Sequence, residues 1–144
     1  MIQYYPDKPV DRSPEDIQEW DRRGCFVCQQ KIDGWRAVVI FGKEIRVLSR
    51  HNKALPIEPE ILEELEQLSK ILPEKTVLDG EWLSRRACSK VKKLQPKLYI
   101  FDMMRCEGTW LKTMRYERRL DLVKHFQREL WKRLVRPSER ILLP

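Results

Sequence analysis

Residues 31–36 read Lys-Ile-Asp-Gly-Trp-Arg, and this stretch decides how the rest of the chain is interpreted. Taken alone, it is typical of a β-hairpin, because Asp-Gly is a favoured two-residue turn between antiparallel strands. The preceding residues, Cys-Phe-Val-Cys-Gln-Gln at 25–30, and the following ones from Trp35 both look like strands. A hairpin does not, however, account for the motifs that follow further along the chain.

Strands and helices are mixed on both sides of this stretch without strict alternation. The pattern predicts strands over 25–30, 35–41, 44–49, 76–83 and 97–103, with a hairpin around Gly42-Lys43. It also predicts helices over 13–22, 56–72 and 114–134, from helical spacing of leucines and from the N-cap pattern Ser13-Pro14. We therefore expect an α+β fold in which helices flank a mostly antiparallel sheet.

The composition indicates one globular domain. The chain has 144 residues, of which 42% are hydrophobic and 35% charged, enough to bury a core under a heavily charged surface. No apolar run approaches the roughly 20 residues that span a membrane, and the first residues lack the apolar segment of a signal peptide. We expect a cytoplasmic protein with no membrane association; the family resemblance given below implies a prokaryotic or viral protein rather than a nuclear one.

Cysteine and charge patterns give weaker signals. Cys25 and Cys28 form a C-x-x-C, but Cys88 and Cys106 are single, so reduced core cysteines are favoured over metal ligands. The net charge of +7 is uneven: residues 1–104 hold 18 basic and 17 acidic side chains, whereas residues 105–144 hold 11 and 5. A basic surface favours a polyanionic partner, although a solvated helix face would look the same.

Four motifs in one order give a more specific interpretation. Residues 31–36 resemble the K-x-D-G-x-R nucleotidyl-transfer motif shared by ATP-dependent DNA ligases, RNA ligases and mRNA capping enzymes. Three further stretches are similar to the next motifs of that superfamily: Val47-Leu48-Ser49-Arg50, Leu78-Asp79-Gly80-Glu81-Trp82 and Tyr99-Ile100-Phe101-Asp102-Met103. The motif sequences are most similar to those of the adenylation domain of DNA ligases. The resemblance covers roughly residues 20–135.

The resemblance implies roles for individual residues. Lys31 would be the nucleophile that attacks the α-phosphate of ATP, and it must lose its proton first, which burial or nearby cations would favour. Phe101 would stack on adenine, with a core position as the alternative, and Trp35 and Trp82 would be packing residues. The nucleotide-binding set implied by the resemblance is Gln29, Ile32, Arg36, Arg50, Glu81 and Phe101.

The cofactors and partners follow from the same resemblance. ATP would act with Mg²⁺ or Mn²⁺, and Glu81 is the metal-binding candidate as well as a possible acceptor for a ribose hydroxyl. The partner would be nicked double-stranded DNA. The alternatives are an RNA ligase, a capping guanylyltransferase, or a non-catalytic fragment whose basic stretch at 85–93 and basic last helix bind nucleic acid.

Two later motifs of the superfamily are not found in this sequence. A Glu-Gly strand and a Lys-x-Lys strand would supply another metal-binding acid and phosphate-binding lysines, and an OB-fold domain would follow. We therefore expect residues 1–144 to be a partial adenylation domain without an OB-fold. Its sheet would have an exposed edge that favours self-association or a partner chain.

Overall fold

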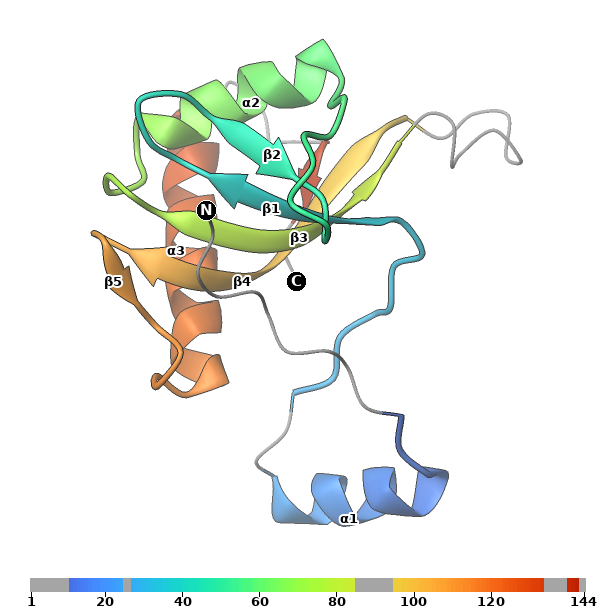
Figure 1. Ribbon diagram of the computed structural model, residues 1–144. Coiled ribbons are helices and arrows are strands. Elements are labelled where there is room, and N and C mark those ends of the chain that lie inside the picture. Colours follow the sequence, from blue (N-terminus) through green and yellow to red (C-terminus); the bar gives the residue numbers. More distant parts are fainter. Residues whose placement is uncertain (1–10, 25–26, 85–94, 134–139, 143–144) are drawn as a thin grey trace.

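An open sheet forms the centre of the protein (Figure 1). The computed structural model describes residues 11–24, 27–84, 95–133 and 140–142. Five strands lie in the order β2-β1-β3-β4-β5 with antiparallel neighbours, and the sixth, β6, pairs with β4 in parallel. The strands are β1 (Trp35–Ile40), β2 (Arg46–Leu48), β3 (Val77–Leu83), β4 (Lys97–Cys106), β5 (Thr109–Trp110) and β6 (Ile141–Leu142).

Two helices bury one face of this sheet. Ala37 and Val39 of β1 belong to one hydrophobic cluster with side chains of α2 (Pro59–Ser69) and α3 (Tyr116–Arg133). The helices contribute the apolar positions at helical spacing: Ile61, Leu65, Leu68, Val123 and Leu130. The α+β fold with a mostly antiparallel sheet and flanking helices is confirmed.

The opposite face of the sheet carries the polar residues. Because side chains alternate along a strand, Arg36, Val38 and Ile40 of β1 point away from the helices. Asp79 and Glu81 of β3 are the direct pairing partners of Val38 and Arg36, so they lie on the same side. We call this side, defined by those five residues, the site face.

The pairing of β3 with β4 is interrupted beside Phe101. Asp79 pairs with Asp102 and Gly80 pairs with Ile100, so Phe101 is an extra residue on β4. Such a bulge bends a strand and re-aims a side chain, and bulges are common beside functional sites.

The helix α1 (Pro14–Arg23) lies apart from the sheet in Figure 1. As predicted, Ser13 is its N-cap and Pro14 opens it, and a capping box links Ser13 with Asp16. Gly24 ends the helix in the left-handed conformation, with φ of 60°. None of its residues is buried. Across the described parts of the chain, no helix has the length and apolar character needed to cross a bilayer.

One secondary-structure expectation was wrong, and two short strands were not predicted. Residues 27–30 form no strand, and Val27 and Cys28 are exposed, so Cys28 is not a core cysteine. Cys25 and Cys88 lie outside the described residues, and Cys106 is half-buried in β4. Strands β5 and β6 were not predicted, since two residues are too few to show a period. Association through a sheet edge stays a prediction.

Candidate functional site

A cavity of about 1000 Å³ opens on the site face. It is lined by the segment before β1, by the start of β1, by residues 49–51 and 53–56, and by one residue each of β3 and β4. All the residues that the resemblance assigned to nucleotide chemistry line it: Gln29, Lys31, Ile32, Arg36, Arg50, Glu81 and Phe101. Segments more than 70 residues apart in sequence therefore meet at one place.

Lys31 lies on an exposed segment that leads into β1. The alternative interpretation of residues 31–36 as an Asp-Gly hairpin does not hold, because no strand precedes Gly34 among residues 27–33. Gly34 is instead required by a close approach to β3: a Cβ there would lie 2.6 Å from the carbonyl oxygen of Trp82. The Gly34 amide also donates a hydrogen bond to Glu81 Oε1 at 3.1 Å. The lysine segment is thus fastened to β3 three residues after Lys31.

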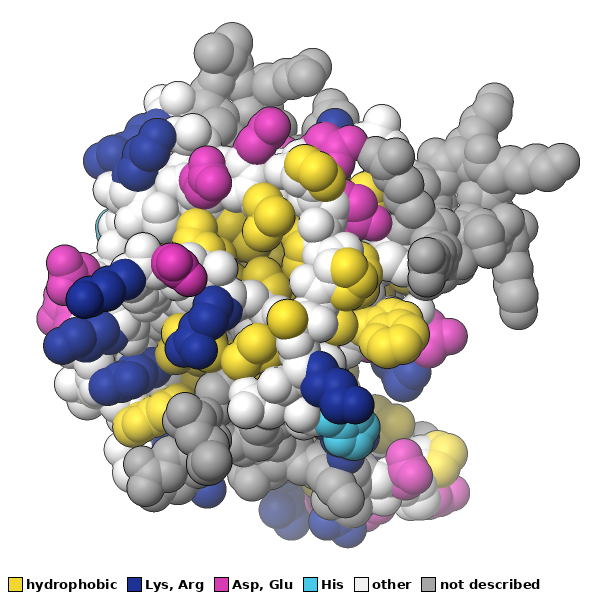
Figure 2. Space-filling view, turned by 45° about the horizontal axis from the view of Figure 1, so that its top comes forward, with side chains coloured by type: hydrophobic (Ala, Val, Ile, Leu, Met, Phe, Trp, Pro, Cys, Tyr) yellow, Lys and Arg dark blue, Asp and Glu magenta, His cyan; other side chains and the backbone are white. Residues whose placement is uncertain are grey.

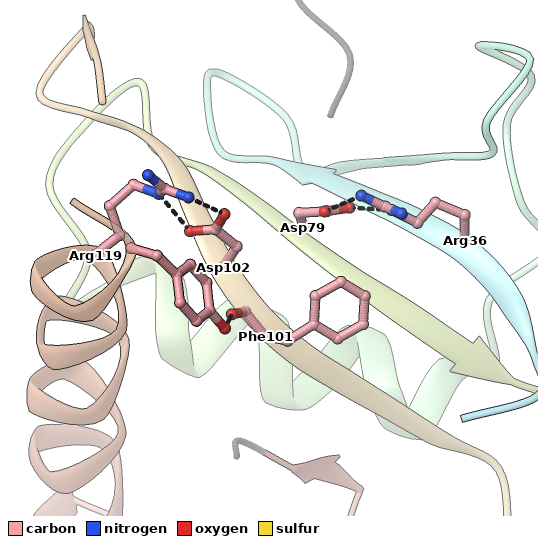
Figure 3. A network of polar contacts seen from close by, with 6 residues as sticks. Arg36, Asp79, Phe101, Asp102 and Arg119 are labelled. Atoms are coloured by element: carbon pink, nitrogen blue, oxygen red, sulfur yellow. Dashed lines mark hydrogen bonds and ion pairs between the residues drawn. The ribbon is translucent and has the colours of Figure 1, made fainter. Parts of the chain in front are cut away.

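Arg36 is held by Asp79 across the β1–β3 pair (Figure 3). Its Nε donates to Asp79 Oδ1 at 2.5 Å, and its Nη2 donates to Asp79 Oδ2. The guanidinium carbon lies 5.5 Å from the centre of the Phe101 ring. The side chain predicted to contact ribose or phosphate is therefore fixed at the cavity wall, with its Nη1 donors outside this fork.

Burial of Asp79 dominates its electrostatics. Only 2% of the residue is exposed, and burial raises the pKa of its carboxyl to about 6. Arg36 opposes this shift, whereas Asp102, its pairing partner on β4, adds to it. The second aspartate is itself paired, because Arg119 of α3 binds both of its oxygens at 2.8 Å. Figure 3 shows the two acids side by side between the two arginines.

The raised pKa predicts that stability depends on pH through Asp79. An unfolded aspartate keeps its ordinary pKa near 3.8, so the folded protein binds the extra proton between about pH 4 and 6. This contribution is fully present below pH 4, is lost as pH rises through 6, and is worth about 3 kcal/mol. Urea unfolding should compare the free energy of unfolding of the parent with that of Asp79→Asn. Between pH 4 and pH 7 the parent should lose about 3 kcal/mol of stability relative to the variant. A constant difference would contradict the assignment.

Glu81 is the acid closest to the lysine segment. Burial raises the pKa of its carboxyl, while the Gly34 amide, Arg36 and Lys31 act in the opposite direction. It is half-buried and is the acidic residue that lines the cavity. Among the described residues, the Gly34 amide is the donor that reaches it, which leaves Oε2 for a ligand.

Phe101 is fastened by a tyrosine of α3. The Tyr116 hydroxyl donates to the carbonyl oxygen of Phe101 at 2.7 Å. Burial raises the pKa of Tyr116 to about 12, so this hydroxyl keeps its proton at neutral pH. Phe101 is not in the hydrophobic cluster, so its position is a cavity wall and not the core. Nothing in the sequence indicated Tyr116.

Arg50 is exposed on a tight turn between β2 and α2. The Ser49 amide donates to the Lys53 carbonyl at 2.7 Å, and Ser49 Oγ accepts from the Lys53 amide at 3.2 Å. Asn52 at the turn has a φ of 59°. This turn also brings His51 and Lys53 to the cavity, two residues that we did not assign to the site.

The two tryptophans differ from the expectation that both are packing residues. Trp82 is buried, and its Nε1 donates to Glu58 at 2.8 Å, which confirms the packing role. Trp35 is 59% exposed and lines the cavity, so its packing role was wrong. An exposed indole at the rim of a polar cavity offers a flat apolar surface to a ligand.

The cavity suits a nucleoside triphosphate in size and charge. Its volume is at the upper end of small-molecule sites, and four cations line it against the single carboxylate of Glu81: Lys31, Arg36, Arg50 and Lys53. Within the described parts of the chain, no three His, Cys, Asp or Glu side chains gather in a way that could hold a metal ion. Glu81 is the acidic side chain that the lining residues offer to a cation at the cavity.

Comparisons with known proteins bear on the family and the fold of the chain. Residues 3–140 match the family described as mRNA capping enzyme, catalytic domain. The structure is similar to the ligase domain from M. tuberculosis LigD, with 20% identity over 81% of this chain and a TM-score of 0.59. It is also similar to a chain named Pmar-Lig_PreS3, with 23% identity over 78% of this chain and a TM-score of 0.54. This chain spans 38% and 28% of the length of those two chains.

No curated protein sequence matches the chain. At these identities the two structures show the fold alone, whereas the family match covers nearly all residues. It also covers each of the four motifs that line or surround the cavity. The chain belongs to the nucleotidyltransferase family of the mRNA capping enzyme catalytic domain, and it shares the fold of ligase domains.

Proposed function

We propose that this chain is the adenylation module of an ATP-dependent DNA ligase. The observation that carries the proposal is that all seven residues assigned to nucleotide chemistry by the resemblance, from four separate segments, line one cavity of suitable size and charge. The motifs at residues 31–36 and 78–82 resemble those of DNA ligases, and this resemblance is the reason for preferring a ligase to a capping enzyme. Nicked double-stranded DNA is the proposed partner, and sealing would occur inside the cell.

The proposed reaction is attack by Nζ of Lys31 on the α-phosphorus of ATP. A nitrogen–phosphorus bond forms, the bond from the α-phosphorus to the bridging oxygen breaks, and pyrophosphate leaves with that oxygen. The lysine nitrogen must give up its protons to solvent around this step. The AMP would then pass from Lys31 to the 5′-phosphate of a nick.

The surrounding residues supply positioning and charge. Lys31 is exposed, so its amino group is open to a ligand in the cavity. Arg36, Arg50 and Lys53 line the same cavity and would stabilise charge on the phosphates. Phe101 and Trp35 offer apolar surfaces for the base, and Glu81 Oε2 would accept from a ribose hydroxyl.

A second candidate is transfer of GMP, because the matching family is described as a capping enzyme. An RNA ligase would share the ATP step and differ in the strand that it seals. The test is intact mass after incubation with Mg²⁺ and either ATP or GTP. The proposal predicts a gain of one AMP with ATP and none with GTP. A gain with GTP alone would establish the capping alternative, and no gain with either would refute nucleotidyl transfer by this chain.

A further inference from the structure

A second hollow lies on the site face, at the other end of the sheet. It has a volume of about 210 Å³, and its lining includes Leu48, Asn52 and a set of five residues that come from five different strands. Each of these five residues pairs directly with the next one across the sheet, in the order Arg46, Ile40, Val77, Arg105 and Trp110. Paired residues point to the same side, so they form one row from β2 to β5.

The row has an apolar middle and a cation on each side. Ile40 and Val77 form its floor, and Arg46 and Arg105 stand one strand further out on either side. At about 4.8 Å between neighbouring strands, the backbones of the two arginines are about 14 Å apart.

Arg105 is held in place for such a contact. Its Nε donates to the Gly108 carbonyl at 2.7 Å, and its guanidinium carbon lies 5.4 Å from the centre of the Trp110 ring. Lys75 is close by, since a Cβ added at Gly108 would lie 3.6 Å from Lys75 Cδ and 3.7 Å from Arg105 Nη2. Arg46 is exposed on β2.

Acidic residues do not cancel this charge within the hollow. Among the described residues, no carboxylate lines it and none forms an ion pair with Arg46 or Arg105. Glu44, Glu74 and Glu107 are exposed in the neighbouring turns. In Figure 2, Lys and Arg side chains gather at the left of the view, on the side where Figure 1 has β5.

The hollow is aligned with the first cavity. Arg36 and Glu81 line the first cavity, and Ile40 and Val77 lie four residues away on the same two strands. Four residues at about 3.3 Å each place the hollow about 13 Å along the sheet. This is close to four nucleotide steps of duplex DNA at 3.4 Å per step.

We propose that this hollow is a binding site for the sugar-phosphate backbone of a polynucleotide strand that passes over the first cavity. Its volume is below that of typical small-molecule sites, so it suits a sugar-phosphate unit better than a whole nucleotide. Arg46 and Arg105 would each bind one phosphate, and the apolar floor would contact the sugars. The identity of the ligand rests on the proposed ligase function.

The test is binding of a fluorescent nicked duplex to the full chain, measured by anisotropy at several salt concentrations. In Arg46→Ala/Arg105→Ala, affinity should fall about tenfold or more at low salt, and the salt slope should become shallower by about two. The control is Arg22→Ala/Arg23→Ala, which removes the same charge from exposed positions of α1. The single change Arg46→Glu is made at an exposed residue and should leave the fold intact. It should also weaken duplex binding, so it tests the site even if the double variant does not fold.

Equal affinity and slope in the two double variants, or no duplex binding by the parent, would overturn the site. So would a double variant that keeps duplex affinity but loses labelling by ATP, because the hollow would then serve the nucleotide. Labelling of Lys31 by ATP needs no DNA, so it tests the proposed function separately. A parent that is not labelled, but loses duplex binding when the arginines are replaced, would refute the ligase and support the hollow.

Discussion

Replacing Lys31 with alanine should abolish covalent labelling by ATP while leaving the fold intact. Alanine has no nitrogen to form the phosphoramidate, so the loss is complete and not graded. Lys31 is exposed and no hydrogen bond from it is found among the described residues, so the free energy of unfolding should change by less than about 0.5 kcal/mol. Intact mass after incubation with ATP and Mg²⁺ measures the label, and urea unfolding measures the stability.

Two companion variants sharpen this result. Lys31→Arg keeps the positive charge, but a guanidinium stays protonated and should also give no label. Lys70→Ala removes an exposed lysine at the end of α2 that bonds Gln67 and does not line the cavity, so it should be labelled like the parent. Label that survives in Lys31→Ala, for example on Lys53, would disprove the assignment of the nucleophile.

The sequence predicted the parts of this fold that repeat a pattern over several residues. Helical spacing identified α2 and α3, and alternation identified β1, β3 and most of β4. Residues 25–30 are apolar enough in sequence to predict a strand. Residues 27–30 are nevertheless exposed, because no other part of the described chain packs over them. The bulge at Phe101 had no local signal, because it depends on the register between β3 and β4.

The motifs located the site residues in the chain but not their contacts. Arg36 and Asp79 are 43 residues apart, and their fork could not be read from either motif alone. Likewise, the Tyr116 contact with Phe101 crosses 15 residues and joins α3 to β4. The roles of the site residues stay predictions, whereas their convergence on one cavity is observed.

The structure gives the two motif glycines a different role from the one that the sequence suggested. Gly34 looked like a turn residue and Gly80 like part of an acidic motif, but both lie where a backbone passes too close for a side chain. At Gly80 a Cβ would lie 2.2 Å from the Tyr99 carbonyl oxygen and 3.0 Å from Ile100 Cδ1. The first of these contacts is with backbone, which cannot move aside without separating β3 from β4.

Replacing Gly80 with alanine should therefore destabilise the protein by about 3 kcal/mol or more. Gly42→Ala is the matched control, since its nearest neighbour is the Glu44 carbonyl at 3.9 Å and its stability should stay within about 1 kcal/mol of the parent. Urea unfolding followed by circular dichroism compares the two. Equal unfolding midpoints for Gly80→Ala and Gly42→Ala would contradict this, because they would show that β3 and β4 can move apart at little cost in free energy. Because Asp79 and Glu81 flank Gly80 on the site face, a folded Gly80→Ala protein should also bind ATP more weakly than the control.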